Sequence, residues 1–107
     1  MRVGFKLKLK NEHLQEEYKK RHDQLWPEML EVLDKAEIKN YSIWNSGQDL
    51  FGYYEVEDLD YSNRVQAESE IVAKWNVYMQ DLLESRVDDN GSVSPVKEAM
   101  DLMFYKK

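Results

Sequence analysis

The periodic patterns along the chain predict an α+β fold, because stretches with the two-residue period of strands alternate with stretches of helical period. Strand patterns open the chain at 3–10 and close it at 96–105. Two neighbouring strand patterns, at 38–44 and 50–56, lie between two helical regions. The order β-α-β-β-α-β, over a single domain of residues 1–107, predicts a ferredoxin-like sandwich with one four-stranded sheet and both helical regions on one face.

The first strand and the helix after it are the clearest local patterns. In residues 3–10, apolar and charged side chains alternate almost without fault, which indicates a strand with one buried face. Asn11 then stands where a helix cap belongs. Leu14, Tyr18 and His22 recur at four-residue spacing, so the predicted helix presents a tyrosine and a histidine on one face.

The helical pattern is interrupted at Trp26-Pro27. Proline has no amide hydrogen, and it disfavours helical geometry in the residue before it. Proline also suits the first position of a helix, and apolar residues continue at helical spacing to about Ala36. We therefore expect two short helices, with His22 close to the joint between them.

The second half of the chain contains a hairpin, a long helix and a loop. A turn cluster at 45–48, in which Gly47 can adopt positive φ, joins the two central strands. The polar segment 58–69 is expected to begin helically, with Asp60 as its cap. Residues 85–95 lack periodicity and predict a loop. Between them, seven apolar residues at spacings of three and four predict an amphipathic helix: Ile71, Val72, Trp75, Tyr78, Met79, Leu82 and Leu83.

Helices on one face of the sheet leave the other face open. Aromatic residues are spread over the predicted strands, and we expect the open face to carry them. An exposed aromatic face usually indicates a ligand pocket or a second subunit. The aromatic residues in question are Phe5, Tyr41, Trp44, Phe51, Tyr53 and Tyr54.

Composition and charge exclude several classes of function. A net charge of −6 and a pI near 4.9 argue against binding to nucleic acid, which needs a concentrated basic surface. The chain has no cysteine and no histidine pair at metal-ligand spacing, so we expect no disulfide, no thiolate chemistry and no metal. Neither a signal peptide nor an apolar run of membrane-spanning length is visible, which favours a cytoplasmic protein with no membrane partner.

His22 is the main candidate for chemistry, since imidazole exchanges protons near neutral pH. A structural residue at a helix end remains the alternative interpretation, and His13 has no obvious partner. Aromatic side chains with polar tips also suit a sugar, because sugar C–H faces stack on rings while the hydroxyls need polar groups. The same aromatic residues can equally fill a core.

One block of residues resembles a known family. The block Glu17-Tyr18-x-x-Arg21-His22-x-x-x-Trp26-Pro27-Glu28 is similar to that of the L-rhamnose mutarotases. Further segments match in the same order: Asn40-Tyr41-Ser42-Ile43, Trp75-x-x-Tyr78-Met79 and Phe104-Tyr105. The resemblance implies a ferredoxin-like chain that pairs with a second copy as a dimeric α/β barrel. It also implies interconversion of the α and β anomers of L-rhamnose, a monosaccharide substrate, without a cofactor.

The same resemblance assigns roles to individual residues. It implies that His22 is the proton donor and that Tyr18 and Tyr41 bind the sugar. Trp75 matches the first of two adjacent tryptophans that complete the family's pocket, whereas the second position is Asn76 in this chain. An amide in place of an indole removes a stacking wall and adds a donor and an acceptor. We therefore expect the proton chemistry to be kept and the sugar preference to be affected.

Anomer exchange of a pyranose passes through the open-chain aldehyde. The ring oxygen must gain a proton while the anomeric hydroxyl loses one, so an acid and a base are sufficient. We predict His22 as the acid, and Glu28 or one of the tyrosines as candidates for the base. Two other functions stay open: a non-catalytic sugar-binding module, and a cofactor-free monooxygenase of the same dimeric barrel fold.

Overall fold

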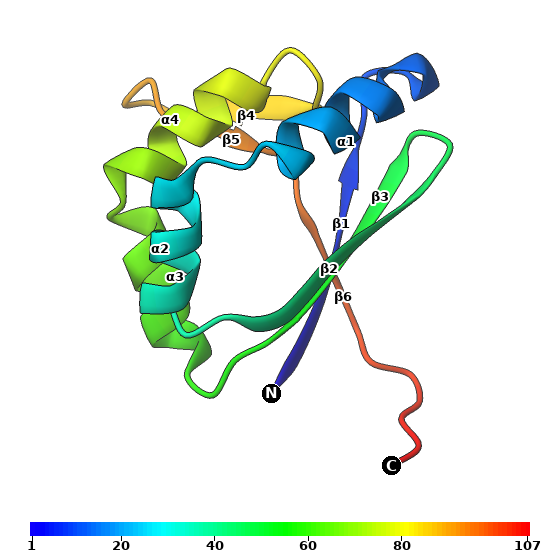
Figure 1. The fold of residues 1–107 in the computed structure, drawn as a ribbon, viewed down its shortest axis with the longest axis vertical. Helices are drawn as coiled ribbons and strands as arrows, with labels where there is room; N and C mark the ends of the chain where they lie inside the picture. Colours follow the sequence, from blue (N-terminus) through cyan, green and yellow to red (C-terminus); the bar gives the residue numbers. More distant parts are fainter.

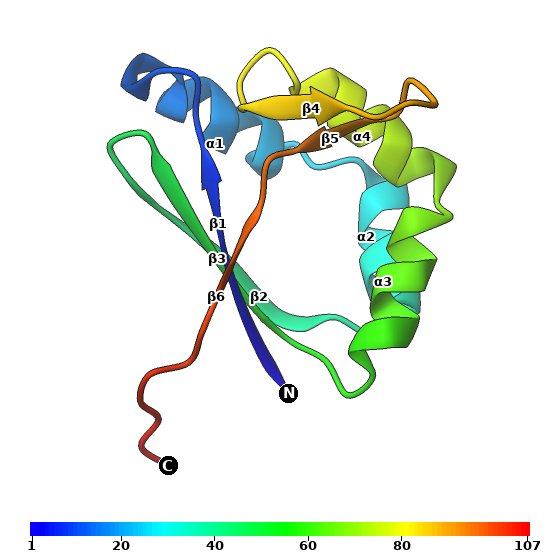
Figure 2. The same cartoon turned by 180° about the vertical axis from the view of Figure 1, so that it is seen from behind.

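The computed structural model describes residues 1–107 and contains a four-stranded sheet, a two-stranded sheet and four α-helices. Figures 1 and 2 show the helices on one face of the larger sheet, while its other face is uncovered. This arrangement confirms the predicted ferredoxin-like α+β fold. In chain order the elements are β1 (Arg2–Lys8), the 3-10 helix η1 (Glu12–Leu14), α1 (Gln15–Asp23), α2 (Pro27–Lys35), β2 (Lys39–Ser46), β3 (Asp49–Glu55), α3 (Leu59–Ala67), α4 (Glu70–Met79), β4 (Ser85–Val87), β5 (Val93–Pro95) and β6 (Glu98–Met100).

The larger sheet is antiparallel, with the strand order β2-β3-β1-β6. The central strand β1 pairs with β3 along its whole length, from Arg2 opposite Glu55 to Lys8 opposite Asp49. On its other edge, β1 pairs with β6. The alternation seen in the sequence of β1 follows from this central position, because the strand has a covered face and an uncovered face.

The hydrophobic core lies between the covered face of the sheet and the helices. Its most enclosed large side chains are Leu9, Leu50 and Met79, each 2% exposed or less. Leu9 follows directly after β1, Leu50 lies in β3 and Met79 in α4, so the core joins the sheet to the last helix. None of the helices has the length and apolar character needed to cross a membrane.

The break between the first two helices is confirmed. Helix α1 ends at Asp23, and α2 begins with Pro27 at its first position. Trp26, before the proline, has φ −59° and ψ 135°, which is extended rather than helical geometry. The chain changes direction at this point, as Figure 1 shows.

The expectation that the strand aromatics lie on the open face is wrong for three of the six. Phe5 and Tyr54 are buried beneath the helices, and the ring of Tyr41 contacts both, with centroid distances of 6.1 and 5.4 Å. Successive side chains of a strand point to opposite faces, so aromatic residues at adjacent positions cannot share one. The register places the remaining three on the uncovered face: Trp44, Phe51 and Tyr53.

Two helix ends differ from the prediction. Helix α3 is capped by Asp58 and not by Asp60, since the Asp58 carboxylate accepts a hydrogen bond of 2.9 Å from the amide three residues later. Helix α4 ends at Met79, four residues early. Leu82 and Leu83 are nevertheless buried, because the turn after the helix folds them into the core.

The prediction of an irregular loop over 85–95 is wrong, because this segment forms the β4–β5 hairpin. The Asp88 carboxylate accepts hydrogen bonds of 2.9 Å from the amides of Asn90 and Ser92, and Gly91 adopts a φ of 82°. The turn residues were visible in the sequence. The strands of three residues were too short to show a period.

The predicted last strand, 96–105, is correct only for Glu98–Met100. Met100 lies opposite Gly4 in antiparallel register, so few residues of β1 remain as partners for the chain that follows. That segment leads away from the sheet, as Figure 1 shows. It carries exposed apolar side chains, among them Leu102 and Phe104, which are 66% and 81% exposed.

Candidate functional site

A cavity of about 690 Å³ lies between the covered face of the sheet and the helices. Its walls are mostly apolar, with side chains such as Met29 of α2 and Ile43 of β2. A few polar side chains interrupt these walls, and most of them come from α1. A concave apolar site with a few polar groups, at this volume, is typical of a small-molecule site.

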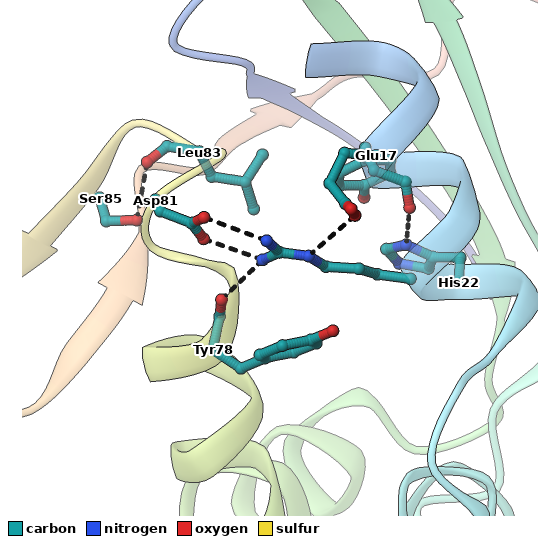
Figure 3. Close-up of polar contacts among 8 residues, drawn as sticks. Glu17, His22, Tyr78, Asp81, Leu83 and Ser85 are labelled. Atoms are coloured by element: carbon teal, nitrogen blue, oxygen red, sulfur yellow. Dashed lines mark hydrogen bonds and ion pairs between the residues drawn. The ribbon is translucent and has the colours of Figure 1, made fainter.

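His22 lies in the last turn of α1, half-buried at the cavity wall. Its Nδ1 is 3.0 Å from the backbone carbonyl oxygen of Tyr18, a contact drawn in Figure 3. A carbonyl oxygen only accepts hydrogen bonds, so Nδ1 carries the hydrogen and the Nε2 of the neutral ring keeps its lone pair. The imidazole packs against the rings of Tyr18 and Trp75, with centroid distances of 4.3 and 5.4 Å.

Burial lowers the pKa of His22 below its ordinary value of 6.5, because the apolar surroundings disfavour the charged imidazolium. The carbonyl of Tyr18 and the charge of Asp23 act in the opposite direction but do not outweigh burial. At neutral pH the ring is therefore uncharged, with Nε2 available to accept a proton.

Two tyrosines add phenol groups to the same cavity. Both line the cavity; Tyr18 is 6% exposed, and Tyr41, on the edge strand β2, is 40% exposed. Burial of the phenols is the main cause that raises the pKa of both, so both stay protonated at neutral pH. Neither hydroxyl has a hydrogen-bond partner in the protein, and the hydroxyl of the buried Tyr18 keeps some contact with solvent. These groups can bind a polar ligand but are unsuited to act as bases.

A β-bulge places Tyr41. The pairing of β2 with β3 shifts by one residue between Lys39 and Ser42. Asn40, inside the bulge, adopts a φ of 52° and donates a hydrogen bond of 3.1 Å to the Glu55 carboxylate. Asparagine tolerates this left-handed geometry better than most residues. Bulges commonly re-aim a side chain next to a functional site, and here the re-aimed side chain is a cavity phenol.

Trp75 of α4 forms another wall of the cavity and is 8% exposed. Its ring meets Trp26 edge-on, with the centroids 5.1 Å apart. Asn76 is half-buried but does not line the cavity, because successive helical residues point about 100° apart. The structure thus brings Trp75 together with the histidine and the two tyrosines, and leaves Asn76 outside this group.

Glu28 also lies outside the cavity. It is exposed in the first turn of α2 and makes no hydrogen bond to the imidazole. The group that orients His22 is the carbonyl of Tyr18, one turn earlier in the same helix.

Comparison with known proteins identifies the family. A sequence profile described as L-rhamnose mutarotase matches residues 2–106. The chain belongs to the L-rhamnose mutarotase family. Among similar proteins, the L-rhamnose mutarotase of Listeria monocytogenes serotype 4b (strain F2365) is 45% identical over 93 residues, or 85% of each chain. The L-rhamnose mutarotase of Lachnoclostridium phytofermentans is 36% identical over 107 residues, 98% of this chain and 97% of that protein.

Crystal structures agree with the family assignment. An L-rhamnose mutarotase from Formosa agariphila has a TM-score of 0.82 at 34% identity, covering 100% of this chain and 99% of that one. A dimeric ferredoxin-like protein from an uncultured marine organism has a TM-score of 0.56 at 14% identity, covering 98% and 97%. The second likeness is one of fold alone.

Sequence reasoning missed several polar residues that line the cavity. Gln15 and Lys19 lie on the same side of α1 as Tyr18 and His22, so the spacing of that face was a usable signal. Gln66 of α3 gave no such signal, because its segment lacks a clear period. Its amide nitrogen donates two hydrogen bonds of 3.3 Å within its own helix, and its amide oxygen has no partner in the protein.

Proposed function

We propose that this chain is an isomerase that interconverts the α and β anomers of L-rhamnose without a cofactor. One observation carries the proposal: an imidazole with a free Nε2 and two unpartnered phenols share a cavity large enough for a monosaccharide, in a member of the L-rhamnose mutarotase family. Tyr18 and Tyr41 bind hydroxyls of the sugar. Trp75 provides an apolar wall for its C–H face or its methyl group.

His22 carries the proton in the proposed mechanism. Its neutral Nε2 takes the proton of the anomeric hydroxyl, and the bond between the anomeric carbon and the ring oxygen breaks with its electron pair on the ring oxygen. The imidazolium then donates the proton to that oxygen, giving the open-chain aldehyde. Ring closure on the other face of the aldehyde reverses these steps. The anomeric hydroxyl oxygen and the ring oxygen are bonded to the same carbon, so one nitrogen can exchange a proton with each in turn. His22 is then both the base and the proton donor, and no separate base is needed.

The direct test is saturation-transfer NMR or polarimetry on freshly dissolved L-rhamnose. The protein is expected to accelerate anomer exchange in proportion to its concentration, and related sugars measured alongside define its preference. A change in tryptophan fluorescence on adding sugar, without acceleration for any sugar, would instead identify a non-catalytic sugar-binding module. That result would remove the enzyme proposal.

The pH dependence of the rate tests the resting state of His22. Because burial lowers its pKa, kcat/KM is expected to stay level at neutral pH and to fall on acidification, with a midpoint below the ordinary value of 6.5. The fall on acidification follows from the mechanism, because a protonated Nε2 cannot accept the proton of the anomeric hydroxyl. The measurement is the rate between about pH 4.5 and 8, corrected for the uncatalysed reaction at each pH. A rate that fell as the pH rose through this range would show that the enzyme must start with a protonated imidazole.

We further propose that the protein acts as a homodimer. The uncovered sheet face presents Trp44, 69% exposed, and the chain after β6 presents Leu102 and Phe104, which are also largely exposed. Sedimentation velocity at micromolar concentration is expected to give a dimer, and Phe104→Asp is expected to shift it toward monomer. Observation of monomer alone for the unmodified chain would contradict this.

A further inference from the structure

Arg21, the residue before His22, connects two helices that are distant in sequence. Its Nη1 and Nη2 donate to the two carboxylate oxygens of Asp81, over 2.8 and 3.0 Å. Nη1 also donates to the backbone carbonyl of Tyr78 over 2.8 Å, and Nε lies 3.6 Å from the carboxylate of Glu17. Figure 3 shows this set of contacts between α1 and the end of α4. The Arg21 side chain is 14% exposed, so these contacts are partly shielded from water.

The Arg21 guanidinium completes the C-terminal end of α4. The last carbonyls of a helix lack partners within it, and a cation there is favoured by the helix dipole. Helix α4 has no basic residue in its own last turn. Arg21 supplies this positive charge from α1 and donates a hydrogen bond to the carbonyl of Tyr78. The guanidinium carbon also lies 4.5 Å from the centroid of the Tyr78 ring. The same guanidinium holds the pKa of the Asp81 carboxyl below its usual value.

The two helices joined in this way carry two walls of the cavity. His22 follows Arg21 on α1, and Trp75 lies on α4 one turn before Tyr78. The Trp75 and Tyr78 rings are 5.5 Å apart, while the Trp75 and His22 rings are 5.4 Å apart and perpendicular. Arg21 itself does not line the cavity. It is therefore placed to set the spacing between the two walls without touching a ligand.

We propose that Arg21 is a positioning residue for the proposed mutarotase reaction: by binding Asp81 and the Tyr78 carbonyl, it fixes Trp75 on α4 relative to His22 on α1. This inference rests on the proposed function for its catalytic consequence. Misplacing a reacting group by about 1 Å can cost roughly 100-fold in rate, so a loosened junction between these helices affects turnover before it affects the fold.

The test compares Arg21→Gln with the unmodified protein and with Lys20→Gln. Lys20 is an exposed cation in the same turn of α1 whose side chain makes no hydrogen bond, so it controls for the loss of charge. At a temperature well below unfolding, kcat for Arg21→Gln is expected to fall roughly 10- to 100-fold, with a smaller change in KM. Lys20→Gln should keep the unmodified kcat. Arg21→Lys, which keeps the charge but not the paired contact with Asp81, should recover only part of it.

A spectroscopic signature separates positioning from simple stabilisation. The His22 imidazole C–H signal in a ¹H–¹³C NMR spectrum depends on the orientation of the Trp75 ring next to it, and it is expected to shift in Arg21→Gln while the His13 signal stays in place. An unshifted His22 signal, or an unchanged kcat with only a lower melting temperature, would overturn the proposal.

The test also remains decisive if Arg21→Gln does not fold or if the unmodified protein is inactive. If Arg21→Gln does not fold, Asp81→Asn takes its place, because it leaves the bond from Arg21 to the Tyr78 carbonyl and should give smaller changes in the same direction. If the unmodified protein does not accelerate anomer exchange, the proposed function fails separately. The His22 signal then still decides whether Arg21 sets the spacing of the two walls.

Discussion

Replacing His22 with alanine is expected to lower the protein-dependent rate of L-rhamnose anomer exchange by roughly 10²- to 10⁴-fold. Burial lowers the pKa of the imidazole, so that its Nε2 is free to accept a proton, whereas burial raises the pKa of both phenols and keeps them protonated. Removal of the imidazole takes away the group that both accepts and donates the proton. The measurement is saturation-transfer NMR at equal protein concentrations.

The other histidine provides a matched control. His13 is exposed in η1, and its ring makes no hydrogen bond, so His13→Ala should keep the full rate. The His22→Ala protein also loses a ring packed against Tyr18 and Trp75, so its fold must be verified by thermal unfolding. Added imidazole is expected to restore part of the rate by entering the vacated space. A near-normal rate in folded His22→Ala would refute the proton-transfer role.

Substituting alanine for Gly52 is expected to lower the free energy of unfolding by about 1–3 kcal/mol or more. Gly52 lies opposite Phe5 in the sheet, and a Cβ at this position would overlap the far edge of the Phe5 ring. Phe5 is 3% exposed and packs against Tyr41 and Tyr54, so its ring has little room to move. Alanine is less flexible than glycine in the unfolded chain, which by itself favours the folded alanine variant by about 0.4–1 kcal/mol. A net loss of stability must therefore come from the overlap with the Phe5 ring. Urea unfolding monitored by circular dichroism measures the difference.

A second glycine of the sheet controls for this substitution. A Cβ at Gly4 would meet the end of the Met100 side chain at 3.3 Å, and that end can rotate away. Gly4→Ala should therefore cost much less than Gly52→Ala. Adding Phe5→Leu to Gly52→Ala should recover part of the lost stability if the ring is the obstacle. Equal costs at the two glycines would contradict the overlap.

Local patterns in the sequence were sufficient for the order of the elements and for part of the site. Tyr18 and His22 are one helical turn apart, so their common face could be predicted from spacing alone. The helix break at Trp26-Pro27 followed from the geometry of proline. Tyr41 was assigned to the site through the family resemblance, because no local pattern shows the bulge that re-aims its side chain.

The features that were not predicted depend on contacts between distant segments. One example is the pair of Arg21 with Asp81, which joins residues 60 positions apart. No periodic pattern in the sequence around either residue indicates which residue it pairs with. Asn76 was placed with Trp75 through the family resemblance, but in this chain only Trp75 lines the cavity, because successive residues of α4 point about 100° apart.

The central position of β1 has a consequence for how the chain is made. One edge of β1 is paired as soon as the β3 hairpin has been synthesised, but the other waits for β6, where Met100 lies opposite Gly4. A ribosome adds about 5–20 residues per second, so this edge stays without its own partner for several seconds in every new chain. Unpaired edges attract foreign strands, and lysines make an edge a poor template for them. We therefore expect Lys6 and Lys8 on β1 to make this edge a poor template for foreign strands in the interval before the last strand is synthesised.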